Sequence, residues 1–268
     1  MEDTKRWSEA QDYELGFWNN VAKDIDSGFG DLGWYRWRAD QLINRLERLN
    51  LHRLTSGSAR IIEVGSGPVG VCTFFPGAER LAVDPLMDQY SSHPAFAKAR
   101  DPEVKYLQGV GERLPSPSSH YDLAIIENCI DHVHDVDAVM RELSRVLKPG
   151  GILYLTVNNR SWAGYFVHRL LSRLKIDRGH PHTFTPGRTR DLIRQSGFQL
   201  RDIEVGSYLQ ATRTDLASGK ARDRLKALLG VSEYVVSVIA EQAAPGQVPL
   251  QRQYGLDKAR EKAAEAVV

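Results

Sequence analysis

A glycine-rich segment with an acidic residue on each side gives the clearest chemical signal in the sequence. It runs from Ile61 to Gly70 and reads IIEVGSGPVG. Glycines that follow a buried strand permit a tight turn and a close approach of backbone to ligand. The segment therefore predicts a strand, a loop and a following helix whose free amides face a ligand. Asp84 comes 19 residues after Gly65, close to the spacing of an acid that binds ribose hydroxyls.

Glu63 narrows the choice of ligand. A carboxylate two residues before the first glycine would repel a pyrophosphate, whereas it suits a ligand with an amino group and a positive sulfonium. The glycine pattern also fits a dinucleotide-binding fold. An NAD-dependent oxidoreductase therefore remains a competing interpretation, which only the loop supports.

The elements that would position these residues alternate along the chain. Short apolar runs, typical of strands buried on both faces, occupy residues 59–65, 80–84, 104–109, 121–128 and 151–157. Further strands are predicted at 198–206 and 233–241, and helices at 135–147, 186–196 and around 213–229. This order is typical of a doubly wound α/β sheet, which brings the loops after its strands to one edge. Residues 7–52 show helical periodicity, broken by the glycines of SGFGDLG.

Composition argues against several classes of protein. The chain has 268 residues with 35 Lys and Arg against 34 Asp and Glu, so we expect no nucleic-acid partner. Cys72 and Cys129 form no zinc-like pattern, and no metal site is predicted. The sequence has no apolar run long enough to span a membrane and no signal-like N-terminus. We expect a cytoplasmic protein without a transmembrane segment.

Five segments together resemble the class I S-adenosylmethionine (SAM)-dependent methyltransferases. EVGSGPVG, starting at Glu63, resembles their motif I, and LAVD, ending at Asp84, resembles their second strand with its ribose-binding acid. Residues 109–133 and 135–157 resemble the stretches through the fourth and fifth strands, and HTFTPGRTRDLIRQSGFQL resembles a later segment. These matches keep their order and spacing over about residues 58–205. They indicate the type 11-like, small-molecule branch.

The resemblance implies a Rossmann-like, doubly wound seven-stranded sheet whose last strand is antiparallel. It divides the chain into an N-terminal helical cap at 1–57, a SAM-binding methyltransferase domain at 58–242 and a flexible tail at 243–268. An insertion is expected at about 158–185. The implied cofactor, SAM, would lie across the carboxyl ends of strands one to four.

The cofactor-binding residues are carried over by their match to the family motifs. They are Glu63, Gly65, Ser66, Gly67, Asp84, Pro85, Gly111, Glu112, Glu127 and Asn128. The resemblance places Glu63 near the methionine ammonium, Asp84 on the ribose hydroxyls and Glu127 near the methionine part. A competing interpretation makes Asp84 an ordinary helix N-cap before Pro85.

One position departs from the family pattern. Val110 stands where the family usually has an Asp that contacts adenine. Glu112 is the nearest replacement acid, with backbone groups of 110–112 beside it. The alternative, which we weigh equally, is that Glu112 is a solvated loop residue.

Histidines near the cleft are candidates for acceptor chemistry. A hydroxyl acceptor must lose a proton, and His132, just after the fourth strand, matches a position where the family often carries a histidine base. Asp131 or Asp135 is its candidate orienting residue, and Asp131 is the one we assign. A cap or an exposed side chain is the alternative role for His132.

The acceptor side has weaker candidates. Those for substrate binding are Trp18, Tyr35, His180 and His182. Residues 165–176 form an amphipathic pattern with basic residues on one side, which predicts a helix packed on the core. A lid over a lipophilic acceptor and contact with a membrane surface or lipid are the weaker alternatives. For the aromatic residues, core packing is the alternative to a pocket wall.

The function that follows is transfer of a methyl group from SAM to a small-molecule acceptor, with oxygen favoured over nitrogen or carbon as the accepting atom. The competing hypothesis is a catalytically inactive SAM-binding module with a regulatory or assembly role.

Overall fold

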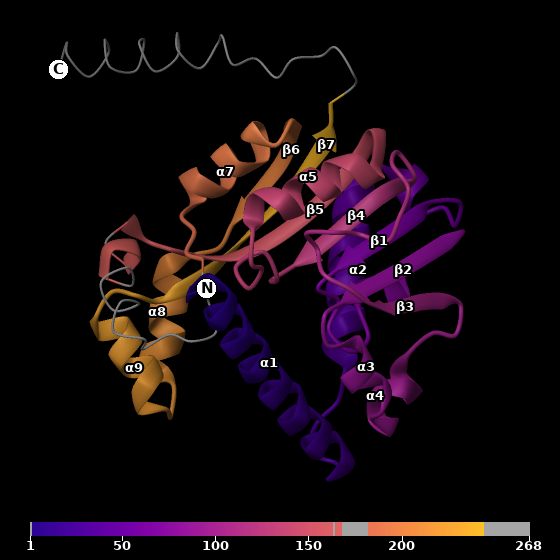
Figure 1. Ribbon diagram of the computed structural model, residues 1–268. Coiled ribbons are helices and arrows are strands. Elements are labelled where there is room, and N and C mark those ends of the chain that lie inside the picture. The colour runs from indigo at the N-terminus through magenta and orange to yellow at the C-terminus, as the bar shows by residue number, and fades with distance from the viewer. Residues whose placement is uncertain (1, 163, 168–181, 244–268) are drawn as a thin grey trace, which may run out of the picture.

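The computed structural model describes residues 2–162, 164–167 and 182–243. Within them lies one seven-stranded sheet of order β3-β2-β1-β4-β5-β7-β6 (Figure 1). The strands are β1 (Arg60–Val64), β2 (Glu79–Asp84), β3 (Val104–Gln108), β4 (Tyr121–Glu127), β5 (Leu147–Arg160), β6 (Phe198–Val205) and β7 (Glu233–Gln242). The last strand, β7, runs antiparallel to both β5 and β6, while β1 to β5 pair in parallel. The predicted Rossmann-like sheet is confirmed.

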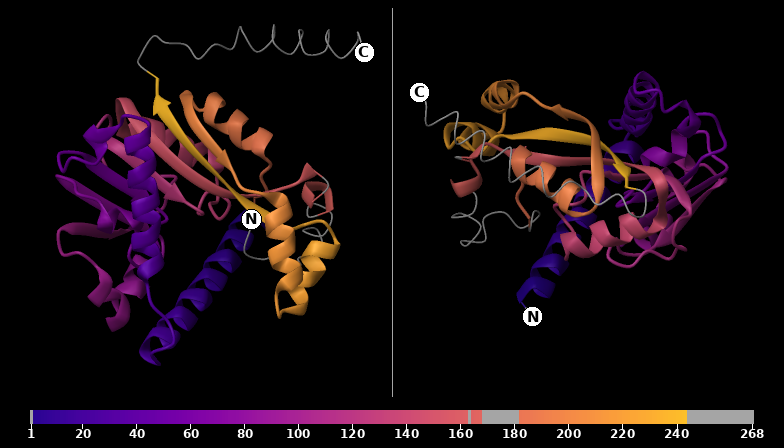
Figure 2. Two further views of the ribbon diagram at one scale, coloured as in Figure 1. Left: turned by 180° about the vertical axis from the view of Figure 1, so that it is seen from behind. Right: turned by 90° about the horizontal axis from the view of Figure 1, so that it is seen from above.

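Helices cover both faces of this sheet, as Figures 1 and 2 show. The helices are α1 (Glu2–Asp26), α2 (Gly33–Arg48), α3 (Met87–Ser91), α4 (Pro94–Ala99), α5 (Val136–Val146), α7 (Pro186–Gln195), α8 (Tyr208–Ala217) and α9 (Ala221–Leu228). Helix α2 lies on one face, and α5 and α7 lie on the other. Two short 3₁₀ helices, η1 (His52–Leu54) and η2 (Val71–Phe74), complete the described elements.

The central strands bury side chains on both sides. In β1, Ile61 joins the apolar cluster under α2, whereas Ile62 and Val64 join the cluster under α5. Successive side chains of a strand point to opposite faces, so a strand between two helical layers needs apolar residues at nearly every position. This requirement explains the continuous apolar runs in the sequence.

The N-terminal helices share the core of the sheet. Leu42 and Leu46 of α2 are fully buried in the same cluster as Ile61. Arg45, also buried, donates a hydrogen bond to the Asp202 carboxylate at 2.7 Å and another to the Ser237 hydroxyl. Helix α2 is therefore part of the layer that covers the sheet, and a domain boundary at residue 57 stays a prediction.

The prediction of a helix after the glycine-rich loop is wrong in its length and type. Only the four-residue η2 follows the loop, and the Glu63 carboxylate accepts hydrogen bonds from the amides of Val71 and Cys72 at 3.0 and 2.7 Å. Pro76 disfavours a helical conformation at Phe75, whose backbone is extended. Strand β2 begins at Glu79, three residues after Pro76. The amides expected to face a ligand are thus bonded within the protein.

The single helix predicted around 213–229 is two helices, α8 and α9. The break falls at Ser218, Gly219 and Lys220. The Ser218 hydroxyl donates to the Asp223 carboxylate at 2.6 Å and accepts from the Lys220 amide at 3.2 Å, so it ties the break to the first turn of α9. The helical periodicity continues across this break, so the pattern alone did not show it.

The predicted insertion at about 158–185 begins inside the sheet. Strand β5 extends to Arg160, and Phe184 returns to form a bridge beside Asn159. Residues 168–181 of the insertion, including most of 165–176, lie outside the described residues, as does the tail from 244. Among the residues that are described, no helix is both long and apolar enough to cross a membrane.

Candidate functional site

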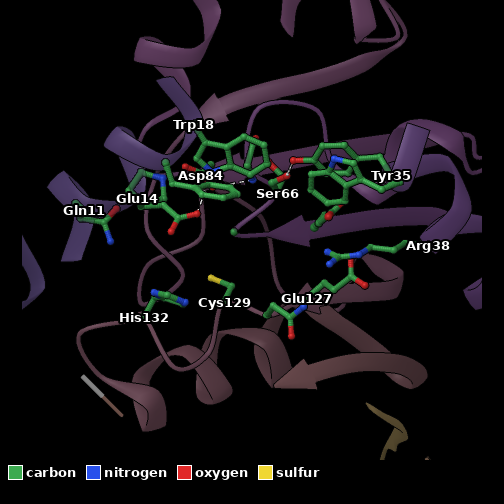
Figure 3. A pocket seen from close by; sticks show the side chains of 17 residues that line it. Gln11, Glu14, Trp18, Tyr35, Arg38, Ser66, Asp84, Glu127, Cys129 and His132 are labelled. Atoms are coloured by element: carbon green, nitrogen blue, oxygen red, sulfur yellow. Dashed lines mark hydrogen bonds and ion pairs between the residues drawn. The ribbon is translucent and has the colours of Figure 1, made fainter. Parts of the chain in front are cut away.

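A pocket lies at the carboxyl ends of β1, β2 and β4, where the loops after these strands meet the N-terminal helices (Figure 3). Its lining comprises Gln11, Glu14, Phe17, Trp18, Trp34, Tyr35, Arg38, Glu63, Gly65, Ser66, Gly67, Asp84, Pro85, Glu127, Asn128, Cys129 and His132. The lining combines four carboxylates, one guanidinium, one imidazole and an aromatic wall. Such a site favours a ligand with positive groups.

The glycine-rich loop forms the floor of this pocket. Gly65 and Gly67 have φ values of 68° and 61°, which glycine adopts without strain. A Cβ at Gly65 would lie 2.0 Å from the Cys129 sulfur, and one at Gly67 would lie 2.6 Å from the Tyr35 hydroxyl. The loop therefore requires glycine at both positions for conformation and for space.

Asp84 is held at the end of β2 by two backbone amides. Its Oδ2 accepts from Gly67 N and its Oδ1 from Leu86 N, each at 2.9 Å. The side chain does not cap helix α3, whose N-cap is Leu86 without a side-chain bond. Burial raises the pKa of Asp84 to about 6. The second acceptor lone pair of each oxygen leaves this carboxylate able to bind hydroxyl donors.

Glu63 lies deeper, beneath the same loop. It is 2% exposed, and burial raises its pKa to about 7 although the two amides of η2 stabilise the charged form. At neutral pH the group carries a partial negative charge directly below the glycine-rich loop. This charge persists because the η2 amides supply hydrogen bonds.

Glu127 and Asn128 lie across the pocket at the end of β4. The Glu127 carboxylate forms an ion pair with the Arg38 guanidinium of α2 at 3.3 Å, and Arg38 lies over the Trp34 ring at 4.6 Å from its centroid. Burial raises the pKa of Glu127 despite the nearby Arg38. Asn128 has a φ of 47°, and its amide donates to the Thr156 carbonyl of β5 at 3.0 Å.

Gly111 and Glu112 do not line the pocket. One carboxylate oxygen of Glu112 accepts from the amides of His134 and Asp135 at 2.8 and 3.1 Å. A Cβ at Gly111 would lie 2.9 Å from a Val64 methyl carbon. Both residues therefore shape the segment before α5, and the structure supports a local role for Glu112.

The candidate histidines take different places. His132 lines the pocket, and its Nε2 lies 3.9 Å from Oδ1 of the buried Asp131. His182 lies outside the lining: its Nε2 donates to the Val133 carbonyl at 2.9 Å, and its amide donates to the Asp131 carbonyl at 3.2 Å. His180 falls outside the described residues.

The aromatic candidates of the N-terminal helices both line the pocket. Trp18 is 5% exposed and stacks on Trp34 with ring centroids 5.8 Å apart, while Tyr35 stacks on Trp34 at 4.0 Å. The Tyr35 hydroxyl donates to the Ser66 carbonyl at 3.1 Å. The cluster therefore packs against the glycine-rich loop as well as forming a pocket wall.

Six lining residues were not among the site residues assigned from the sequence, and two of them are the aromatic residues Phe17 and Trp34. The other four are Gln11, Glu14, Arg38 and Cys129. Gln11 and Glu14 share a helical face with Trp18, since spacings of three and four residues recur between them. The helical period could have grouped them, whereas nothing in the local sequence pairs Arg38 with Glu127. Among the described residues, no cluster of three or more His, Cys, Asp or Glu could hold a metal ion.

The model of a family described as "Methyltransferase domain" matches residues 62–155. The match covers β1 to β5, which carry the glycine-rich loop, Asp84 and the end of β4. It confirms, for this part of the chain, the resemblance drawn from the motifs.

Curated relatives of the methyltransferase domain are distant. A ubiquinone biosynthesis O-methyltransferase of Rickettsia canadensis is 23% identical over 167 residues, which cover 59% of this chain and 70% of the relative. Another of the same name, from a Bradyrhizobium strain, is 27% identical over 108 residues, or 40% of this chain and 42% of the relative. The chain thus spans between two fifths and about two thirds of the relatives' length.

Solved structures share the fold. A SAM-dependent methyltransferase from Mesorhizobium loti matches with a TM-score of 0.52 at 20% identity, covering 73% of this chain and 96% of that one. A geranyl diphosphate C-methyltransferase from Streptomyces coelicolor, solved with S-adenosyl-L-homocysteine, matches with a TM-score of 0.54 at 13% identity, covering 78% of this chain and 85% of that one. At these identities the likeness concerns the fold alone.

Proposed function

We propose that the protein is a SAM-dependent methyltransferase that acts on a small-molecule acceptor at oxygen. The observation that carries this proposal is the pocket at the carboxyl ends of β1, β2 and β4, where a glycine-rich loop meets four carboxylates. SAM carries a sulfonium and an ammonium, so an acidic lining stabilises it. The same lining would oppose the pyrophosphate of NAD.

The described side chains fit the parts of SAM. The Asp84 carboxylate, with lone pairs not used by its two amide partners, would accept from the ribose hydroxyls. Glu63 and Glu127 would attract the ammonium, and Arg38, the guanidinium of the lining, would pair with the methionine carboxylate. When bound, SAM supplies an electrophilic methyl group on a positive sulfur. The protein's own task is to hold an acceptor in line with that group.

His132 is the proposed general base. It lines the pocket beside Asn128 and Cys129, and Oδ1 of Asp131, 3.9 Å from its Nε2, would orient the ring. A base that removes the proton of a hydroxyl makes the oxygen a better nucleophile. The curated relatives are named as O-methyltransferases, which supports oxygen as the accepting atom.

The fit lacks an acidic contact for adenine. Val110 replaces the family's Asp, and the Glu112 carboxylate is bonded to the amides of His134 and Asp135. Adenine would then rest on Pro85 and on the aromatic wall. This feature keeps a catalytically inactive SAM-binding module as the second candidate function.

Two measurements test the proposal. Calorimetric titration with S-adenosylhomocysteine and with NAD should show binding of the first and none of the second, and the reverse result would overturn the proposal. Formation of S-adenosylhomocysteine from SAM with phenolic, carboxylic and amine acceptors then separates enzyme from module. Tight cofactor binding without transfer to any acceptor would favour the module.

A further inference from the structure

One peptide group of the glycine-rich loop is held from both sides. Its carbonyl, on Ser66, accepts a hydrogen bond from the Tyr35 hydroxyl at 3.1 Å. Its amide, on Gly67, donates to Oδ2 of Asp84 at 2.9 Å. Tyr35 belongs to α2 and Asp84 to β2, so this peptide group joins an N-terminal helix to the second strand (Figure 3).

The Tyr35 side of this link has little freedom. Tyr35 is 3% exposed and stacks on Trp34, and its hydroxyl lies 2.6 Å from the place that a Cβ of Gly67 would occupy. Burial and the nearby carboxylates of Glu63 and Asp84 raise the pKa of Tyr35 well above its usual value. The hydroxyl therefore stays protonated and acts as a donor to the carbonyl.

The Asp84 side depends on the orientation of the same peptide group. The Leu86 amide, two residues along the chain, holds one oxygen of the carboxylate, and the Gly67 amide holds the other. Glycine tolerates many backbone conformations, so the peptide before Gly67 can rotate if nothing holds its carbonyl. Such a rotation would turn the Gly67 amide away from Asp84 and release one side of the carboxylate.

We propose that Tyr35 is a positioning residue for the cofactor site, which fixes the Asp84 carboxylate through the Ser66–Gly67 peptide group. The proposal rests on the proposed binding of SAM at this site. It gives Tyr35 a different role from contact with the acceptor, because the hydroxyl is used on the loop. It also makes an N-terminal helix part of the apparatus that orients the ribose-binding acid.

A double-mutant cycle tests this link. Its variants are Tyr35→Phe, Asp84→Ala and the double variant, with the Kd for S-adenosylhomocysteine measured by calorimetry on the full chain. We expect Tyr35→Phe to raise the Kd roughly five-fold, the scale of one lost hydrogen bond. In the Asp84→Ala background the same change should raise the Kd by less than about two-fold, because the group that Tyr35 positions is absent.

Tyr121→Phe is the matched control. Tyr121 is also buried, at 1% exposure, and its hydroxyl is hydrogen-bonded to the Ser116 hydroxyl at 3.0 Å, at the opposite end of β4 from the pocket. The control should lower the melting temperature about as much as Tyr35→Phe and leave the Kd unchanged.

A ligand-free measurement adds a second readout. The Asp84 carboxyl should titrate at higher pH in Tyr35→Phe than in the unmodified protein when followed by NMR, because its charged form loses a hydrogen bond. The positioning role is overturned if Tyr35→Phe raises the Kd by the same factor in the unmodified protein and in Asp84→Ala. It is also overturned if Tyr35→Phe changes neither the Kd nor the titration of the Asp84 carboxyl. Absence of any binding by the unmodified protein would instead refute the proposed function.

Discussion

The two halves of the pocket are built differently. On the side of β1 and β2, backbone amides hold both oxygens of Glu63 and of Asp84, and the loop glycines fit their neighbours closely. On the side after β4, His132 lies near Asp131 at 3.9 Å, and His182 bonds the loop that follows. The first side is preorganised for one ligand, whereas the second is assembled from separate loops. This contrast suits a constant cofactor and an acceptor selected by loop residues.

The largest expected effect concerns the side of the pocket after β4, which we call the acceptor half; the side after β1 and β2 is the cofactor half. His132→Ala should lower kcat at least about 100-fold, the contribution of a general base, while the Kd for S-adenosylhomocysteine stays the same. His134→Ala, an exposed neighbour, is the control. Steady-state kinetics and calorimetry separate the two quantities. Unchanged turnover in His132→Ala would remove this residue from the base role.

On the side of the pocket after β1 and β2, we expect the opposite result: cofactor binding should change. Asp84→Ala should weaken SAM binding by about 2 kcal/mol, or roughly 30-fold in Kd, through loss of charge-assisted hydrogen bonds to two hydroxyls. Asp88→Ala removes an exposed carboxylate four residues later and should change nothing. An unchanged Kd in Asp84→Ala would show that the ribose is placed wrongly.

The pH dependence of SAM affinity should also come from the cofactor half of the pocket. Burial raises the pKa of Asp84 to about 6 and that of Glu63 to about 7, so both carboxyls lose charge as the pH falls through these values. Affinity for the cationic cofactor should therefore rise several-fold from pH 5 to pH 8. Glu63→Gln should flatten the upper part of this rise. A curve of the same shape in that variant would contradict the assignment.

The same two groups affect stability with the opposite sign. Their folded-state pKa values lie above the usual ones, so their contribution to the free energy of unfolding is fully present below about pH 4 and is lost as the pH rises through about 6 and 7. Denaturation curves at several pH values, in Glu63→Gln and in the unmodified protein, measure this contribution.

A smaller effect would sharpen the description of the acceptor half. His182→Ala removes the donor to the Val133 carbonyl, next to His132, and should lower kcat roughly three-fold to ten-fold by loosening this loop. His182→Gln keeps an N–H donor and should recover most of the loss. Equal activity in all three proteins would show that the contact does not position His132.

Much of the fold could be predicted from local patterns. Strands buried on both faces leave continuous apolar runs in the sequence. The strands that contain Ile61, Leu81, Leu123 and Ile152 were predicted for that reason. The break at Gly219 was missed because helical periodicity continues through it. The shortness of η2 was missed because it depends on Pro76 and on the hydrogen bonds from Glu63.

Part of the candidate site could likewise be predicted from local sequence, and part depends on tertiary contacts. The glycine pattern and the spacing to Asp84 predicted a loop and an acid that the structure brings together at 2.9 Å between Gly67 N and Asp84 Oδ2. Glu112 matched a motif yet lies outside the pocket lining, because its carboxylate bonds to the amides before α5. The pairing of Arg38 with Glu127 joins residues 89 positions apart, which no local pattern records.

The sequence by itself determined the methyltransferase-like sheet, its glycine-rich loop and the acid after its second strand, because each follows from residues close together in the chain. Tertiary structure alone decided that Tyr35 and Trp18 pack on that loop, that Arg38 faces Glu127 and that Glu63 bonds to the amides of η2. Those contacts depend on where α1 and α2 lie against the sheet. Helix position follows from packing of the whole core, and periodicity shows only which face of a helix is apolar.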